Sequence, residues 1–154
     1  MRLQEVLDES LSKKNMDWGA DGAHYVIYPS GKFESAFVNV TIHENNSIMM
    51  SSLVGSRLGV WVAHGEGKFN LTKPKDDYNI TGTFSYSQYP GNPNGSDYDA
   101  AILSSEDGRH LAMMPHLERS IFPWQWPWYE NKDDEVTPWI EALTNARKWV
   151  SDSV

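Results

Sequence analysis

The chain has 154 residues, a net charge of −8, seven tryptophans and no cysteine. Its length and its apolar content of 40% suit one folded domain and exclude a chain disordered by composition. The negative charge argues against a nucleic-acid partner, which would repel it, and the missing cysteines exclude disulfides and thiolate metal sites.

The first 30 residues predict a short amphipathic helix and a polar, glycine-containing lead-in. Apolar residues at Leu3, Val6, Leu7 and Leu11 recur with helical spacing. The segment is not followed by the apolar core of a signal peptide. The sequence also contains no apolar run long enough to span a membrane. We therefore expect a cytoplasmic protein that does not enter the membrane.

The middle of the chain predicts several strands. Apolar and polar residues alternate over 33–42, which indicates a long strand with one buried face. The continuous apolar run 58–63 predicts a central strand covered on both faces. A further strand is expected over 81–86, after which a cluster of prolines, glycines and asparagines at 90–96 marks a dense turn.

A hairpin is predicted in the last third of the chain. Asp107-Gly108 is a strong hairpin turn pair, and the apolar runs 100–104 and 110–114 flank it. The prolines in 121–129 exclude regular structure from that tryptophan-rich stretch.

The chain closes with a predicted helix over 137–150. Thr137 is the expected N-cap, and Pro138 suits the first turn. The predicted buried stripe consists of Trp139, Ile140, Leu143, Ala146, Trp149 and Val150.

His116 and Glu118 are the candidate catalytic residues. On an extended segment, residues two apart point to the same side. A carboxylate that accepts the Nδ1–H of a histidine fixes its tautomer and leaves Nε2 to take a proton from a nucleophile. The pair would then form two thirds of a triad whose nucleophile cannot be a cysteine of this chain. The spacing alone also fits two unrelated surface residues.

The sequence His64-Gly65-Glu66-Gly67 follows the apolar run 58–63. Its glycines permit a close backbone approach to a small polar substrate, although a tight turn with solvated charges fits equally well. A metal site built from His64, Glu66, His116 and Glu118 is chemically possible, but no known ligand spacing supports it. The tryptophans would permit a carbohydrate-binding surface, yet they more often fill an interface or cover a core edge.

Three segments together resemble the glutaminase domain of phosphoribosylformylglycinamidine synthases, and they occur in the order which that family uses. Phe33-Glu34-Ser35 and the closing helix also fit, so that the resemblance covers about 31–150. The three segments are Val62-Ala63-His64-Gly65-Glu66-Gly67-Lys68-Phe69, Gly91-Asn92-Pro93-Asn94-Gly95-Ser96 and Gly108-Arg109-His110-Leu111-Ala112-Met113-Met114-Pro115-His116-Leu117-Glu118-Arg119.

The resemblance implies an α/β fold, specifically the C-terminal portion of a class I glutamine amidotransferase-like mixed sheet with flanking helices. Residues 31–154 would form this portion as one structural unit, and residues 1–30 would be a helix and lead-in that do not match the family.

The resemblance also implies a role in purine biosynthesis. The glutaminase domain would hydrolyse L-glutamine, with His116 as base, Glu118 as its orienting partner and His64–Gly67 near the substrate. The ammonia would serve a separate synthetase domain that forms the amidine of formylglycinamide ribonucleotide. ATP and Mg would bind to that synthetase domain, so we expect no cofactor and no metal in this chain.

Two departures from the family bear on activity. Leu117 stands where the family usually has proline. The nucleophile elbow with its cysteine, and the oxyanion-hole donors beside it, have no counterpart here, so we expect the isolated chain to be inactive. The alternatives are a non-catalytic interaction module and a tryptophan-rich carbohydrate- or metal-binding domain. Exposed apolar surface on a partial sheet would favour a homodimer.

Overall fold

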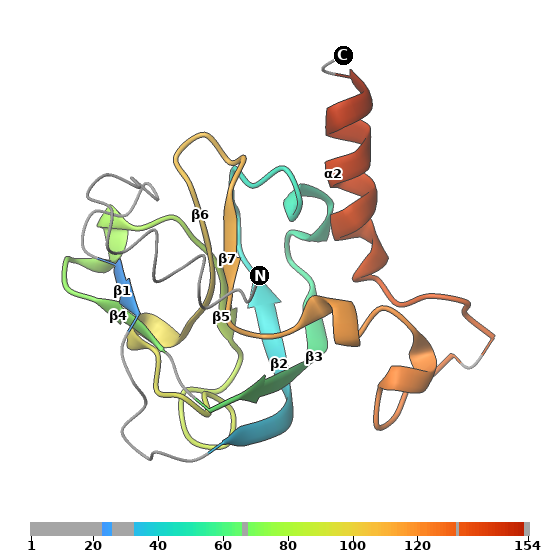
Figure 1. Cartoon of the computed structure of the whole chain (residues 1–154), viewed down its shortest axis with the longest axis horizontal. Coiled ribbons are helices and arrows are strands. Elements are labelled where there is room, and N and C mark those ends of the chain that lie inside the picture. The colour runs from blue at the N-terminus through green and yellow to red at the C-terminus, as the bar shows by residue number, and fades with distance from the viewer. Residues whose placement is uncertain (1–22, 26–32, 66–67, 132, 153–154) are drawn as a thin grey trace.

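The computed structural model describes residues 23–25, 33–65, 68–131 and 133–152 (Figure 1). The helix expected over 3–14 lies outside these ranges. The described part of the chain begins with the short strand β1, of which Tyr25 is the last residue.

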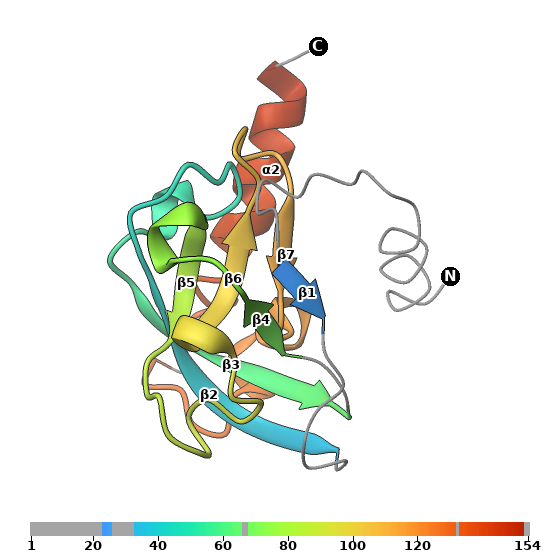
Figure 2. The same ribbon diagram turned by 90° about the vertical axis from the view of Figure 1, so that its left-hand side faces the viewer.

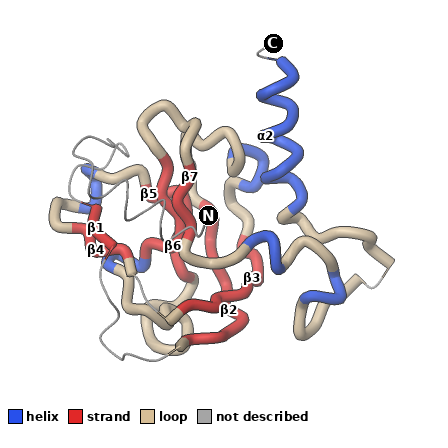
Figure 3. Tube along the Cα trace, viewed as in Figure 1, coloured by secondary structure: helices blue, strands red, loops and turns tan. Residues whose placement is uncertain are grey.

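The described strands form two antiparallel sheets (Figures 1 and 3). The larger one has five strands in the order β3-β2-β5-β6-β7, and the smaller one pairs β1 with β4. One α-helix, α2, closes the described chain, and single 3₁₀ turns lie in the connections. The bounds are β1 Ala23–Tyr25, β2 Glu34–Ile42, β3 Arg57–His64, β4 Phe69–Leu71, β5 Ile80–Phe84, β6 Ala100–Ser104, β7 Leu111–Met113 and α2 Ile140–Asp152.

The long alternating segment forms β2, as predicted. Val38, Val40 and Ile42 on one face are at most 5% exposed and lie in the main core. Side chains two apart on a strand share a face, so this spacing buries three β-branched residues together. The central strands β5 and β6 continue the core, and every residue of β6 is buried.

The predicted hairpin is also confirmed. Strands β6 and β7 pair antiparallel, with Ile102 opposite Met113. Gly108 has φ +70°, and its N–H donates to the Ser105 carbonyl at 3.0 Å. Glycine adopts this left-handed conformation without the penalty that a Cβ would bring.

The position predicted for the strand at 58–63 is wrong. This strand, β3, is buried on both sides as expected, but it lies at the edge of the five-stranded sheet. Its outer edge meets the connection after β7, where Trp61 forms an isolated bridge with His116. A covered edge gives the same continuous apolar pattern as a central strand, so burial alone could not distinguish the two.

The helix forms close to its predicted bounds, but its predicted buried stripe is only partly right. Trp139 and Ala142 are fully buried, whereas Leu143, Trp149 and Val150 are 42%, 37% and 56% exposed. In Figures 1 and 2, α2 rises away from the sheet. Its first turns meet the body, and near its other end the Arg109 guanidinium of the β6–β7 hairpin lies 5.0 Å from the centre of the Trp149 ring. In the first turns the Asn145 amide donates to the Met49 carbonyl at 3.1 Å, which selects the face that begins with Trp139 and Ala142.

The tryptophan-rich stretch is irregular apart from one 3₁₀ turn, η5 (Pro123–Gln125), as predicted. Trp126 folds back from it onto the outer face of the sheet. Its ring meets the Phe37 ring edge-on with centroids 5.1 Å apart, and Phe37 meets Trp61 at the same separation. Gly59 lies beneath these rings and leaves the room that they occupy.

The close packing over Gly59 predicts that Gly59→Ala destabilises the fold. A Cβ at this position would lie 2.5 Å from the Phe37 ring and 2.9 Å from the Trp126 ring. Overpacking of this kind lowers the free energy of unfolding by roughly 1–3 kcal/mol. Urea denaturation measures the change.

Gly65→Ala is the matched control, because the nearest atom to its Cβ would be at an ordinary 3.5 Å. Equal losses of stability in the two variants would contradict the packing argument.

Candidate active site

The centre of the site is the His116–Glu118 pair, which the sequence predicted. His116 Nδ1 lies 2.8 Å from Glu118 Oε1, across the first residues of the 3₁₀ turn η4 (Leu117–Arg119). Arg119 Nε is 3.7 Å from the same oxygen. The imidazole is 28% exposed and the carboxylate 61% exposed, so the pair is open to a reactant.

Two hydrogen bonds to the backbone of Trp61 hold this pair against β3. The His116 N–H donates to the Trp61 carbonyl at 2.7 Å, and the Trp61 N–H donates to the Ser120 hydroxyl at 3.2 Å. Both polar backbone groups on the outer edge of Trp61 are thus used by the segment that carries the pair. The turn is anchored on a strand, which fixes the direction of the imidazole better than a free loop would.

Ser120 joins this turn to the rest of the C-terminal region. Its side chain and backbone are fully buried, and its carbonyl accepts hydrogen bonds from the Thr137 hydroxyl at 2.6 Å and from Trp126 Nε1 at 2.8 Å. Buried polar groups that lose a partner cost roughly 1–3 kcal/mol. These bonds therefore tie the start of α2 and the aromatic stretch to the His116 turn.

His64 and Gly65 lie at the C-terminal end of β3, three to four residues beyond Trp61. His64 Nε2 contacts the Asn94 side-chain amide nitrogen. Burial lowers the pKa of the His64 imidazole below its usual value, and the charge of His116 adds to this effect, although Asn94 and the Glu34 carboxylate oppose it. The structure therefore brings His64 into the electrostatic neighbourhood of His116.

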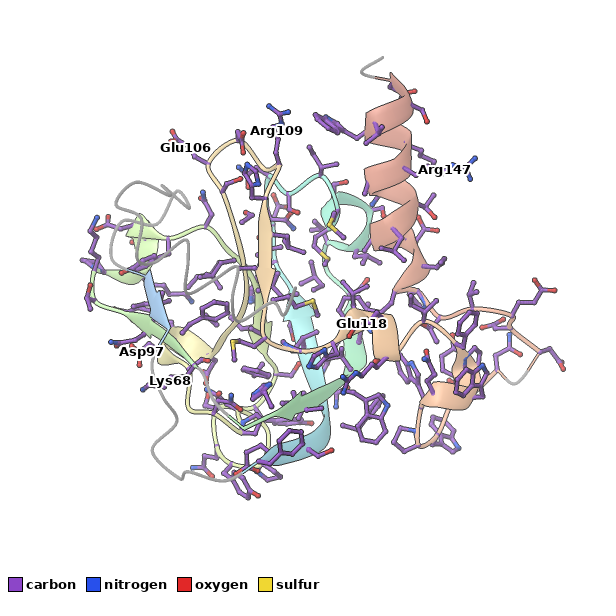
Figure 4. All side chains as sticks on the ribbon, in the orientation of Figure 1. Lys68, Asp97, Glu106, Arg109, Glu118 and Arg147 are labelled. Carbon is purple, nitrogen blue, oxygen red and sulfur yellow. The ribbon has the colours of Figure 1, made fainter. Side chains whose placement is uncertain are left out.

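Glu66 and Gly67, the other two residues predicted to bind substrate, lie outside the described ranges. The chain on their far side is held by the same turn that contacts His64. The Phe69 N–H donates to the Ser96 hydroxyl at 3.2 Å, and the Leu71 N–H donates to Asp97 Oδ2 at 2.9 Å. Lys68 lies beside Asp97, with 3.7 Å between Nζ and Oδ1 (Figure 4).

Asn94 and Ser120 are the residues that sequence reasoning did not assign to the site. Asn94 stands in a segment that predicts a turn, and the turn is present: Asn92 Oδ1 accepts the Ser96 N–H at 3.0 Å. Its additional contact with His64 joins residues 30 positions apart. Ser120 directly follows the His116 motif, but its bond to Trp61 spans 59 residues.

This arrangement can transfer a proton. Glu118 accepts from Nδ1 of His116, which leaves Nε2 as the nitrogen that takes a proton from a nucleophile and returns it to a leaving group. The described residues contain no group of three histidine or acidic side chains that could hold a metal ion. Two pockets in the described part of the chain, of about 390 and 380 Å³, are lined by other residues.

The described part of the chain also contains no helix with the length and apolarity that a membrane span requires.

Comparison with known proteins gives a consistent result. A family model for the CobB/CobQ-like glutamine amidotransferase domain matches residues 24–150. An Arabidopsis thaliana protein named probable phosphoribosylformylglycinamidine synthase, chloroplastic/mitochondrial, is 41% identical over 82% of this chain. The Homo sapiens phosphoribosylformylglycinamidine synthase is 39% identical over 78% of it. The chain spans only 10% of the length of each of these two relatives.

A solved structure, that of PurLQS from Thermotoga maritima, superposes with a TM-score of 0.65 at 20% sequence identity. The match covers 86% of this chain and 55% of the other. This likeness concerns the fold, and it confirms the α/β class expected from the sequence. Within the described residues of this chain, every strand pair is antiparallel.

The lowered pKa of His64 predicts a change of stability with pH. In the unfolded chain His64 takes up a proton near pH 6.5, and in the folded state its pKa lies lower. The neutral histidine therefore stabilises the fold above about pH 6.5. This stabilisation is lost as the pH falls through the folded pKa. Urea midpoints measured between about pH 7.5 and 5.5 should therefore fall more steeply for the natural chain than for His64→Gln.

His43→Gln, the same change at an exposed histidine, is the matched control. A pH dependence that stays the same in His64→Gln would show that His64 is not held in its neutral form by the fold.

Proposed function

The chain belongs to the CobB/CobQ-like glutamine amidotransferase domain family, and from this we infer that it forms the C-terminal part of the glutaminase domain of a phosphoribosylformylglycinamidine synthase. The observation that carries the inference is the His116–Glu118 pair, joined at 2.8 Å and bonded to β3 within the matched segment. The names of the Arabidopsis thaliana and Homo sapiens relatives support this choice within the family.

The proposed reaction is the hydrolysis of L-glutamine. His116 Nε2 takes the proton of a cysteine thiol, and the thiolate attacks the carboxamide carbon. When the carbon–nitrogen bond breaks, His116 returns the proton to the departing ammonia, and water then hydrolyses the thioester to glutamate. Glu118 holds the imidazole in the required tautomer and stabilises the imidazolium that forms between these steps.

The thiol must come from outside the 154 residues, since the sequence contains no cysteine. We propose that the ammonia passes to a synthetase part of the same enzyme, which binds ATP and Mg and converts formylglycinamide ribonucleotide to its amidine. His64 and Gly65, at the end of β3 and beside Asn94, are proposed to lie next to the glutamine.

Further proposals follow from the sequence. The matched unit is taken to be 31–154, and the protein is taken to act in the cytoplasm, although the name of the Arabidopsis thaliana relative includes chloroplastic/mitochondrial. A homodimer through exposed apolar surface would use side chains such as Leu143, Trp149 and Val150 on α2.

The catalytic role of His116 is tested in a chimera that has residues 24–150 of this chain in place of the matching segment of the Homo sapiens relative. Amidine formation is measured with glutamine and, separately, with ammonium as the nitrogen source. His116→Ala should reduce the glutamine-dependent rate by at least about 10³-fold, because no base remains to activate the thiol, and should leave the ammonium-dependent rate unchanged.

His43→Ala is the control, since His43 is an exposed histidine whose Nε2 bonds to Thr83 on the sheet. A chimera that keeps its glutamine-dependent rate after His116→Ala would contradict the role of His116 as the base. A chimera active with ammonium but not with glutamine would indicate that Leu117 or another departure has disabled the segment.

The isolated 154-residue chain is expected to release no ammonia from glutamine. It supplies a base and an orienting carboxylate but no thiolate, and loss of a triad nucleophile costs on the order of 10⁶ in kcat in a well-studied protease. A coupled glutamate assay measures the release. Ammonia release that disappears in His116→Ala would contradict this expectation.

A further inference from the structure

The segment between η4 and α2 projects beyond the sheet as a separate lobe (Figure 1, orange). We refer to its described residues, 121–131 and 133–136, as the aromatic lobe. Trp124 and Trp128 are 78% and 72% exposed, and Phe122 is 41% exposed. Large aromatic side chains are seldom left in water in this way, and such clusters mark surfaces that bind another molecule.

The exposed rings are ordered, although they contribute little to the core. Phe122 and Trp124 stack with centroids 5.9 Å apart and an interplanar angle of 9°. Gln125 fixes the turn beneath them, since its side-chain oxygen accepts the Phe122 N–H at 2.9 Å. Trp126 has the opposite role, because it packs against Phe37 and anchors the lobe to the sheet. The lobe therefore presents a preformed aromatic surface.

A pocket of about 390 Å³ opens at the base of this surface. Three aromatic residues, Trp126, Trp128 and Tyr129, line it together with two acidic residues, Glu130 and Asp134. The Tyr129 hydroxyl donates to Asp134 Oδ2 at 3.2 Å, which holds that carboxylate in place. The lining residues are Arg57, Leu58, Trp126, Trp128, Tyr129, Glu130, Asn131, Asp134 and Pro138.

The charge of the lobe is negative. Residues 130–135 contain four carboxylates and one lysine. None of the ion pairs found in the described ranges involves these four carboxylates. The cation that lines the pocket, Arg57, has its guanidinium 4.6 Å from the centre of the Tyr86 ring, with which it makes a cation–π contact. The pocket thus combines aromatic rings with two acidic residues, Glu130 and Asp134, and with one cation whose guanidinium lies over the Tyr86 ring.

We propose that the aromatic lobe docks a basic surface of a partner polypeptide, and that an arginine side chain of this partner enters the pocket. A planar guanidinium stacks on an indole ring while its N–H groups bond to carboxylates, which matches Trp128 beside Glu130 and Asp134. The exposed rings of Phe122 and Trp124 would cover the partner around this arginine. The inference goes beyond the glutaminase chemistry and does not depend on it.

The pocket is tested with N-acetyl-L-arginine amide on the ¹⁵N-labelled 154-residue chain. The probe should produce saturable shifts of the tryptophan indole N–H signals, with a dissociation constant on the order of 1 mM, as one charged side chain can provide. N-acetyl-L-citrulline amide has nearly the same shape but no charge, and it should bind at least about tenfold more weakly. Equal binding of the two, or no saturable shift, would overturn the arginine site.

Adjacent acidic residues provide matched variants. Glu130→Gln with Asp134→Asn removes the carboxylates of the two acidic residues that line the pocket. The double variant should bind N-acetyl-L-arginine amide about tenfold more weakly, or weaker still. Glu135→Gln with Asp133→Asn makes the same change in total charge outside the pocket, and should alter binding less than about twofold. Equal losses would show a general charge effect and contradict the site. Because Asp134 also bonds to Tyr129 and Asn131, Glu130→Gln alone is the second test.

To distinguish a polypeptide partner from a free cation, the affinity of a peptide that contains arginine is compared with that of the single residue. A capped peptide with leucine and proline on both sides of one arginine should bind about tenfold more tightly than N-acetyl-L-arginine amide, and this gain should disappear in Trp124→Ala. A peptide that binds no better than the single residue would show that the pocket takes an isolated cation and would overturn the docking surface.

Discussion

The arrangement of the C-terminal half depends on one covered strand edge. Trp61, on the outer edge of β3, bonds through its carbonyl to His116 and through its N–H to Ser120. The Ser120 carbonyl then accepts from Thr137 and Trp126. An uncovered edge would present unpaired backbone groups, which attract other strands. Here the groups at Trp61 are satisfied by the segment that carries the proposed base, so one set of bonds protects the edge and orients the imidazole.

A second set of contacts organises the opposite end of β3. The turn at 92–97 bonds to His64 through Asn94, and to the backbone of Phe69 and Leu71 through Ser96 and Asp97. Both flanks of the predicted substrate loop are therefore held by one turn. His116 is anchored three residues before His64 on the same strand, which explains how a proposed base and a proposed binding loop come together although 52 positions separate them in the chain.

Local patterns predicted part of this structure correctly. Alternation identified β2, Asp107-Gly108 identified the β6–β7 hairpin, and the proline spacing excluded regular structure from the aromatic stretch. The errors concern partners that are far away in the chain. The apolar run of β3 indicated burial. It did not show whether a second strand or an irregular segment covers its outer edge. The face of α2 was largely misassigned because polar partners help to select it: Asn145 bonds to the Met49 carbonyl, and Arg109 lies over the Trp149 ring.

The sequence by itself determined the family of the chain and predicted the pairing of His116 with Glu118. The pair forms, but Glu118 lies in the 3₁₀ turn η4 and not on the extended segment from which the pairing was predicted. The sequence also determined that no thiol accompanies them. Only the tertiary structure decided that β3 is an edge, that Asn94 contacts His64, and that Ser120 joins the His116 turn to α2. These contacts link residues 17 to 59 positions apart, and such distances close only when strand pairing and packing fix the path of the whole chain.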